Sequence, residues 1–192
     1  MVSLPHDGQE HVLGDLALAS DGSVLVPDSG ASVIWRLAAG AEALERFIAH
    51  EEFISLQGLV ILPDGTIFAA DHANGLLRID SVNHTVQRMA SPHSTTMIGI
   101  DGLSLAPNGD LIAVQNGLRP KRILRLTLDA GGNAVTQITV LESAHLVMAE
   151  PALGCIAGND FVFIGNAGWS RFEETGVKPT APRPIPILRT KL

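Results

Sequence analysis

The chain has 192 residues, of which 46% are hydrophobic and only 17% are charged, so it can build a substantial core. No run approaches the roughly 18 consecutive apolar residues of a transmembrane helix, which argues against a membrane partner. The net charge is −7 and no cluster of basic residues occurs, so the positive patch typical of nucleic-acid-binding proteins is missing. An acidic protein is instead expected to attract cations.

One sequence plan occurs four times, at residues 13–29, 56–72, 98–116 and, in degenerate form, 149–166. In each copy a polar position precedes a short apolar strand, a turn follows, and a second apolar strand ends in polar residues. A period of about 40–50 residues with several short strands per unit is typical of a β-propeller blade. Because one blade cannot bury both of its faces, we predict an all-β propeller with about four blades, each a four-stranded antiparallel sheet.

In chain order, residues 1–11 form a polar lead-in, and the blades begin near residues 12, 53, 99 and 150. In the first three blades, the third strand is predicted at residues 32–37, 75–79 and 121–128. The outermost strand is predicted at residues 44–48, 85–89 and 134–141. Residues 187–189 are expected to form a last strand. Cys155 lies in an apolar strand and is predicted to be an inert core thiol. A single cysteine cannot form an internal disulfide, so a cytoplasmic and a secreted localisation both stay open.

A propeller must close, because open sheet edges invite pairing with other chains. Four-bladed closure is uncommon, and the repeat begins almost at the first residue. We therefore interpret residues 1–192 as a single, incomplete propeller domain that is part of a six-bladed one. The alternatives are a small closed propeller and closure by self-association through the open sheet edges.

The innermost strand of each propeller blade lines the central channel, and the residues just before it converge at one mouth. By register these residues are Gly14, Asp15, Gln57, Asp101 and Glu150. Residues after the second strands return to the same mouth, namely Asp28, Asp71, Gln115, Asn116 and Asn166. Such a ring of carboxylates and amides predicts a site for a hard divalent cation, since hard cations take several oxygen ligands.

For several of these residues a structural role is the alternative. Asp28 and Asp71 end strands and could cap loops, and Asp101 precedes a glycine, as many turn residues do. Gln57 has no turn role, which favours a channel-facing position. The seven histidines show no metal-binding spacing, and only His72 is expected near the mouth. No serine lies in a G-x-S-x-G context, which argues against a serine hydrolase.

The sequence resembles the senescence-marker-protein/gluconolactonase/luciferin-regenerating-enzyme-like family of six-bladed propellers. The resemblance rests on LQGLVILPDGTIFAADH at 56–72, GIDGLSLAPNGDLIAVQNG at 99–117, RILRLTLD at 122–129, and the C-terminal EPALG, FVFIGNAGWSRF and PIPILRTKL. It covers nearly the whole chain but about four of six blades, and it overlaps with NHL-type repeats. In that family a divalent metal, often calcium, is held by a Glu of the first blade, an Asn before Gly-Leu and an Asp before Gly. Asp101 matches the Asp, Gln57 stands where the Asn would be, and the Glu has no counterpart.

The resemblance implies a metal-dependent lactone or ester hydrolase with its site at the channel mouth. Asp101 would bind the metal and serve as general base, with Gln57 and Glu150 as further ligands. The amides of Gln57, Gln115, Asn116 and Asn166 would orient a small substrate such as a lactone. The alternatives are a non-catalytic NHL-like propeller that binds a small ligand or a protein, and a truncated, inactive gene product.

Overall fold

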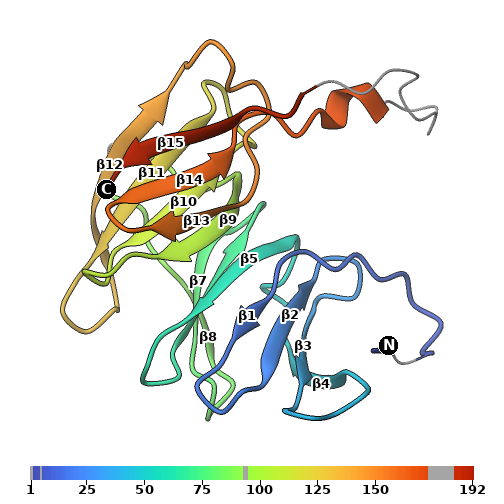
Figure 1. Cartoon of the computed structure of the whole chain (residues 1–192). Helices are drawn as coiled ribbons and strands as arrows, with labels where there is room; N and C mark the ends of the chain where they lie inside the picture. Colours follow the sequence, from blue (N-terminus) through green and yellow to red (C-terminus); the bar gives the residue numbers. More distant parts are fainter. Residues whose placement is uncertain (1, 5, 93–94, 173–183) are drawn as a thin grey trace.

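The computed structural model of the chain describes residues 2–4, 6–92, 95–172 and 184–192. These residues form four antiparallel sheets that follow one another along the chain (Figure 1). Within each sheet the strands are in sequence order, so each sheet is a simple meander. The first strands of successive sheets contact one another, β1 with β5, β5 with β9 and β9 with β13, which places all four at the centre of the array.

The strands of each sheet have the following bounds. Sheet 1 contains β1 (Ala17–Leu18), β2 (Val24–Asp28), β3 (Val33–Leu37) and β4 (Glu45–Ala49). Sheet 2 contains β5 (Leu56–Ile61), β6 (Ile67–Asp71), β7 (Gly75–Ile79) and β8 (Val86–Arg88). Sheet 3 contains β9 (Ile100–Leu105), β10 (Leu111–Gln115), β11 (Arg122–Leu128) and β12 (Val135–Ser143). Sheet 4 contains β13 (Gly154–Ala157), β14 (Asp160–Ile164) and β15 (Ile187–Lys191), and a 3-10 helix, η1 (Trp169–Phe172), follows β14.

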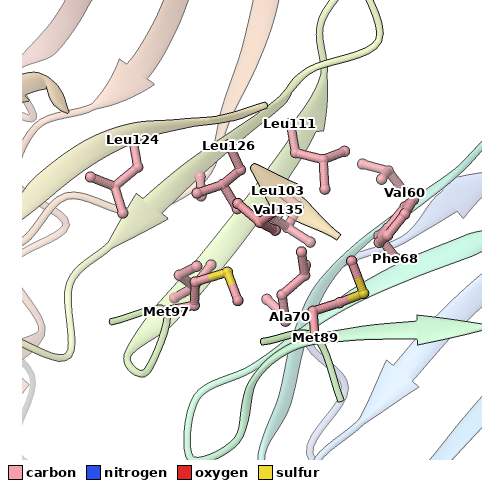
Figure 2. Packing of buried hydrophobic residues seen from close by; sticks show 13 residues of the cluster. Val60, Phe68, Ala70, Met89, Met97, Leu103, Leu111, Leu124, Leu126 and Val135 are labelled. Atoms are coloured by element: carbon pink, nitrogen blue, oxygen red, sulfur yellow. The ribbon is translucent and has the colours of Figure 1, made fainter. Parts of the chain in front are cut away.

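The hydrophobic core consists of layers between consecutive sheets. Figure 2 shows the layer between sheets 2 and 3, where Phe68 and Met89 of sheet 2 lie against Leu103, Leu111 and other side chains of sheet 3. Similar layers join sheet 1 to sheet 2 and sheet 3 to sheet 4. Because sheets 2 and 3 have a neighbour on each side, every residue of their second strands β6 and β10 is buried. This explains why the first four residues of each of these strands form a continuous apolar run rather than an alternating pattern.

The strands predicted from the sequence are present, with ends that differ by one or two residues, and the last strand is β15. Within the described residues, however, sheet 4 has three strands rather than four. The prediction that Cys155 is a core thiol is wrong, because its side chain is exposed. The polar lead-in packs against sheet 1, where Leu4 contacts the cluster of Val33 and Trp35.

Among the helices in the described part of the chain, none has both the length and the apolar character needed to cross a bilayer.

Candidate functional site

Two polar side chains reach the centre of the array because the innermost strands carry bulges. In β5 the pairing with β6 shifts by one residue between Leu56 and Leu59, and β9 shifts in the same way against β10 over residues 100–103. The bulged segments contain Gln57 and Asp101. A bulge leaves its extra residue outside the ladder and can re-aim that side chain. The sequence prediction that these two residues occupy equivalent positions at the mouth agrees with this register.

A cavity of about 440 Å³ lies at this place and is lined by residues from all four repeats. Its polar lining side chains include Asp15, Gln57 and Asp101. At the register position of Asp101, the first repeat supplies Gly14 and the last supplies Ala152, and both also line the cavity. The mouth predicted from the repeats therefore exists as one space.

Glycines after the bulged residues let the innermost strands approach closely. A Cβ on Gly58 would lie 2.6 Å from the Leu103 backbone N and 2.7 Å from the Asp101 backbone O. A Cβ on Gly102 would lie 3.1 Å from Leu153 Cδ2. Any side chain at Gly58 would push β5 away from β9, so the glycine fixes how near Gln57 lies to the next repeat.

The carboxylate of Asp101 is half-buried and held by a neighbouring amide. Asn116 Nδ2 donates a hydrogen bond to Asp101 Oδ2 and also to the Pro151 backbone O at 3.0 Å. Burial raises the pKa of Asp101 above its usual value, while the Asn116 hydrogen bond and the charges of His72 and Lys121 oppose this rise. Asp101 is thus a carboxylate that the protein keeps partly desolvated and oriented.

Asp15 is a second carboxylate of this kind. Its pKa is raised by burial and also by the negative charge of Asp101, and it is lowered by a hydrogen bond from the Leu16 backbone N–H at 2.8 Å. The two carboxylates line one partly desolvated space, which is the arrangement that a bound cation or a proton would stabilise.

Gln115 does not line the cavity, although the sequence analysis placed it among the substrate-binding residues. Its side chain is buried, and its Nε2 donates to the Thr96 backbone O at 2.9 Å and the Ile98 backbone O at 2.7 Å. Its Oε1 accepts from Arg122 Nε at 2.8 Å. All its polar atoms are therefore engaged in joining the start of β9 to the β10–β11 hairpin.

Asp28 and Asp71 occupy the same register position as Gln115 and have the structural role that the sequence left open. Asp71 is fully buried and accepts hydrogen bonds from the backbone N–H groups of Ile54 and Ser55, both at 2.8 Å, and from those of Ala73 and Asn74. Each carboxylate thus ties the segment before an innermost strand to the hairpin after the second strand.

Asp28 adds a side-chain cluster to this arrangement. Its Oδ2 accepts from Trp35 Nε1 at 2.9 Å and from His11 Nδ1 at 2.7 Å, while His11 Nε2 faces Asp7 Oδ1 at 3.1 Å. The pKa of His11 is raised, chiefly by the hydrogen bond to Asp28, with burial opposing. These hydrogen bonds of Asp28 and His11 hold in place the segment that follows His11, whose residues Val12 and Leu13 form part of the cavity wall.

Glu150 and Asn166 lie beside the cavity and are engaged locally. The Glu150 carboxylate accepts from the Ser170 backbone N–H, at 3.1 and 3.3 Å to its two oxygens. The Asn166 Oδ1 accepts from the Gly168 backbone N–H at 3.1 Å. The bulge position in the last repeat belongs to Ala152, two residues after Glu150, because the degenerate fourth repeat has a shorter turn.

Lys121 is a residue near the site that the sequence analysis missed. Its Nζ donates to the Asn116 backbone O, and its charge lowers the pKa of Asp101. The only signal in the sequence is that a lysine follows Asn116 after five residues. That spacing brings the lysine to the mouth only because the β10–β11 hairpin turns back on itself.

The oxygen donors that could hold a metal at the mouth are Asp15, Asp101 and the amide of Gln57. In the parts of the chain that the structure describes, no group of three or more His, Cys, Asp or Glu side chains is placed to hold a metal ion. A cation here would therefore depend on two carboxylates, amide or backbone oxygens, and water or substrate.

No protein-family model matches the sequence, and no curated protein matches it either. Solved structures do match. Virginiamycin B lyase from Staphylococcus aureus superimposes with a TM-score of 0.57 at 17% identity, covering 94% of this chain and 55% of that one. A gluconolactonase from Xanthomonas campestris gives 0.64 at 10% identity, covering 81% and 55%.

The fold is a β-propeller. A putative gluconolactonase agrees, with a TM-score of 0.62 at 13% identity and a coverage of 84% of this chain and 60% of that one. The propeller predicted from the repeat is thus confirmed, and the chain spans 55–60% of the length of these three structures. At such identities the likeness establishes the fold and leaves activity open.

Proposed function

We propose that the propeller mouth is a site for a divalent cation and for hydrolysis of a lactone or other small ester. The observation that carries the proposal is Asp101, a half-buried carboxylate with a raised pKa, which a bulge aims into a cavity that also contains Asp15 and Gln57. Perturbed carboxylates in a cleft are typical of functional sites. Two of the structures that superimpose on the chain are described as gluconolactonases, which favours a lactone as the substrate class.

The donor set suits a hard cation, but only in part. Asp15 and Asp101 supply two carboxylates whose mutual repulsion a cation would relieve, and Gln57 supplies an amide oxygen. When bound, a divalent cation would polarise the carbonyl oxygen of an ester and lower the pKa of a water molecule.

The chain's own residues have separable roles in this proposal. Asp101 is the proton acceptor for an attacking water, because it is a half-buried carboxylate in the cavity wall. Asn116 fixes the orientation of that carboxylate by donating to one of its oxygens. The amide of Gln57 can donate to an ester oxygen, and the apolar side chains of Leu153 and Trp169 form the wall against which a small ring could rest.

Calorimetric titration with Ca²⁺ and a lactone hydrolysis assay test this proposal on the same preparation. We expect calcium binding that disappears in Asp101→Asn, together with a loss of hydrolysis of about 100-fold or more, the usual contribution of a general base. Asp64→Asn is the matched control, because Asp64 accepts a hydrogen bond from Thr66 in a distant turn. Unchanged calcium binding and hydrolysis in Asp101→Asn would refute the assignment.

A second candidate function is the binding of a small ligand without catalysis. It is favoured by the composition of the cavity, where seven apolar side chains, among them Leu13, Leu153 and Trp169, outnumber the four polar ones. It is also favoured by Gln57, which stands where the related hydrolases are expected to carry Asn. A chain that binds no calcium in the titration, but binds a lactone with unchanged affinity in Asp101→Asn, would support this alternative.

A further inference from the structure

The cavity at the mouth has two unlike sides. In the described part of the chain, its four polar side chains all come from the first three repeats and are Asp15, Ser29, Gln57 and Asp101. Five of its seven apolar side chains come from residues 152–169, which belong to the fourth repeat and the segment directly after it. We call these five the apolar wall: Ala152, Leu153, Ile164, Ala167 and Trp169. One ligand in this cavity therefore meets polar groups on one side and hydrocarbon on the other.

The apolar wall departs from the repeat at the point where the innermost strands meet. The second and third repeats carry Gly58 and Gly102 there, and the fourth repeat carries Leu153. The contacts establish this equivalence: a Cβ on Gly58 would lie 3.0 Å from the Gly102 backbone C, and a Cβ on Gly102 would lie 3.5 Å from Leu153 Cα. The Leu153 side chain reaches across Gly102, since its Cδ2 lies 3.1 Å from that same Cβ position. It therefore lies in the cavity beside the segment that carries the Asp101 carboxylate.

Hydrogen bonds hold the outer part of the apolar wall in place. The Glu150 carboxylate accepts from the Ser170 backbone N–H, and the Glu150 backbone O accepts from the Ala167 backbone N–H at 2.8 Å. These bonds tie the turn that carries Trp169 to the start of the fourth repeat. Trp169 is 71% exposed, so its ring presents an apolar surface at the rim of the cavity. The carboxylate that the sequence analysis assigned to a metal thus positions the wall.

We propose that the substrate is a lactone or ester with an alkyl substituent that lies on the apolar wall, and that Leu153 selects it against polyhydroxylated sugar lactones. This inference rests on the proposed function, in which Asp101 and Gln57 face the carbonyl group. A hydroxyl group placed against the wall would give up its hydrogen bonds to water without replacement, whereas an alkyl chain there is removed from water. The cavity volume of about 440 Å³ lies within the range of small-molecule sites.

Calorimetric titrations with γ-lactams in a calcium-containing buffer measure this preference without hydrolysis, because an amide resists attack far better than an ester. The series runs from the unsubstituted ring to the ethyl, butyl and hexyl derivatives, with gluconolactam as the polyhydroxylated counterpart. We expect the affinity to rise about two- to fourfold per methylene, the upper value being that of a fully buried methylene. Gluconolactam should bind about 100-fold more weakly than the butyl derivative. Equal or undetectable affinities along the series, or tighter binding of gluconolactam, would overturn the inference.

Variants of Leu153 test its part in this selection. Leu153→Ser should weaken binding of the hexyl lactam about tenfold and leave the unsubstituted lactam unchanged, a split that a general loss of folding would not produce. Leu153→Met keeps an apolar side chain of similar volume and should retain the affinity for the hexyl lactam. Leu146→Ser is the matched control, because Leu146 is fully exposed and does not line the cavity. An equal loss for all lactams in Leu153→Ser, or the same loss in Leu146→Ser, would contradict the role of Leu153.

The inference and the proposed function can fail separately. Hydrolysis of alkyl-substituted and sugar lactones is measured on the same preparation. If neither lactone is hydrolysed while lactam affinity still rises with chain length, the catalytic proposal fails and the ligand class stands. If sugar lactones are hydrolysed while lactam affinity does not depend on chain length, the proposed function stands and the inference is overturned.

Discussion

Replacing Gly58 by alanine tests whether the innermost strands approach as closely as the structure shows. The new Cβ would lie 2.6 Å from the Leu103 backbone N and 2.7 Å from the Asp101 backbone O. Ordinary contacts begin near 3.4 Å, so β5 and β9 must separate by about 0.8 Å. Overpacking of this kind lowers the free energy of unfolding by about 1–3 kcal/mol. We expect Gly58→Ala to lie at the upper end of this range, because the atoms that its Cβ meets belong to the backbone and cannot rotate away.

Alanine also restricts the unfolded chain, which offsets about 0.4–1 kcal/mol of that cost. We therefore expect Gly58→Ala to lower the free energy of unfolding by about 2 kcal/mol, measured by urea denaturation. For a chain of this size the melting temperature should fall by roughly 4–8 °C.

Gly131→Ala is the control for Gly58→Ala. The nearest atom to its new Cβ is Asn133 Nδ2, the end of a side chain that can move aside, so its stability should stay within about 0.5 kcal/mol of the unmodified protein. If Gly58→Ala were as stable as Gly131→Ala, the inner strands would not be in contact, and the argument that the bulges bring Gln57 and Asp101 to one cavity would fail.

Three further variants test the remaining assignments. The hydrogen bond to Asp28 raises the pKa of His11. The stabilisation from this His11–Asp28 pair is therefore complete below the unfolded pKa of 6.5 and is lost as the pH rises through the folded pKa. His11→Ala should abolish this loss of stability, as measured by urea titrations at pH 6 and pH 9. Asp101→Asn should increase stability at pH 7, since burial penalises the ionised form above its raised pKa, and a destabilised variant would contradict this. Gln115→Leu should lower the free energy of unfolding by about 1–3 kcal/mol, because it leaves Arg122 and two backbone carbonyls unpaired. Its calcium affinity should not change. A loss of calcium affinity at full stability would instead show that Gln115 belongs to the site.

The candidate site could be predicted only in part from the sequence. Gln57 and Asp101 were found because they stand at the same offset from their turn glycines. Glu150 was assigned to the mouth by extending that offset into the degenerate fourth repeat, where a shorter turn gives the position to Ala152. Gln115 was assigned because it ends a strand, and sequence position does not tell whether an amide at a strand end points into a cavity or into a hairpin.

The sequence by itself determined the repeating four-stranded unit, its turns and its radial stacking, because these depend on local patterns of apolar, glycine and turn residues that recur about every 40–50 positions. Only the tertiary structure decided which polar groups share a space. The pKa of Asp101 depends on burial and on the charges of His72 and Lys121, which the fold brings together from separate hairpins. It also decided that Cys155 and Leu16 are exposed, because burial on a blade depends on whether a neighbouring sheet covers it.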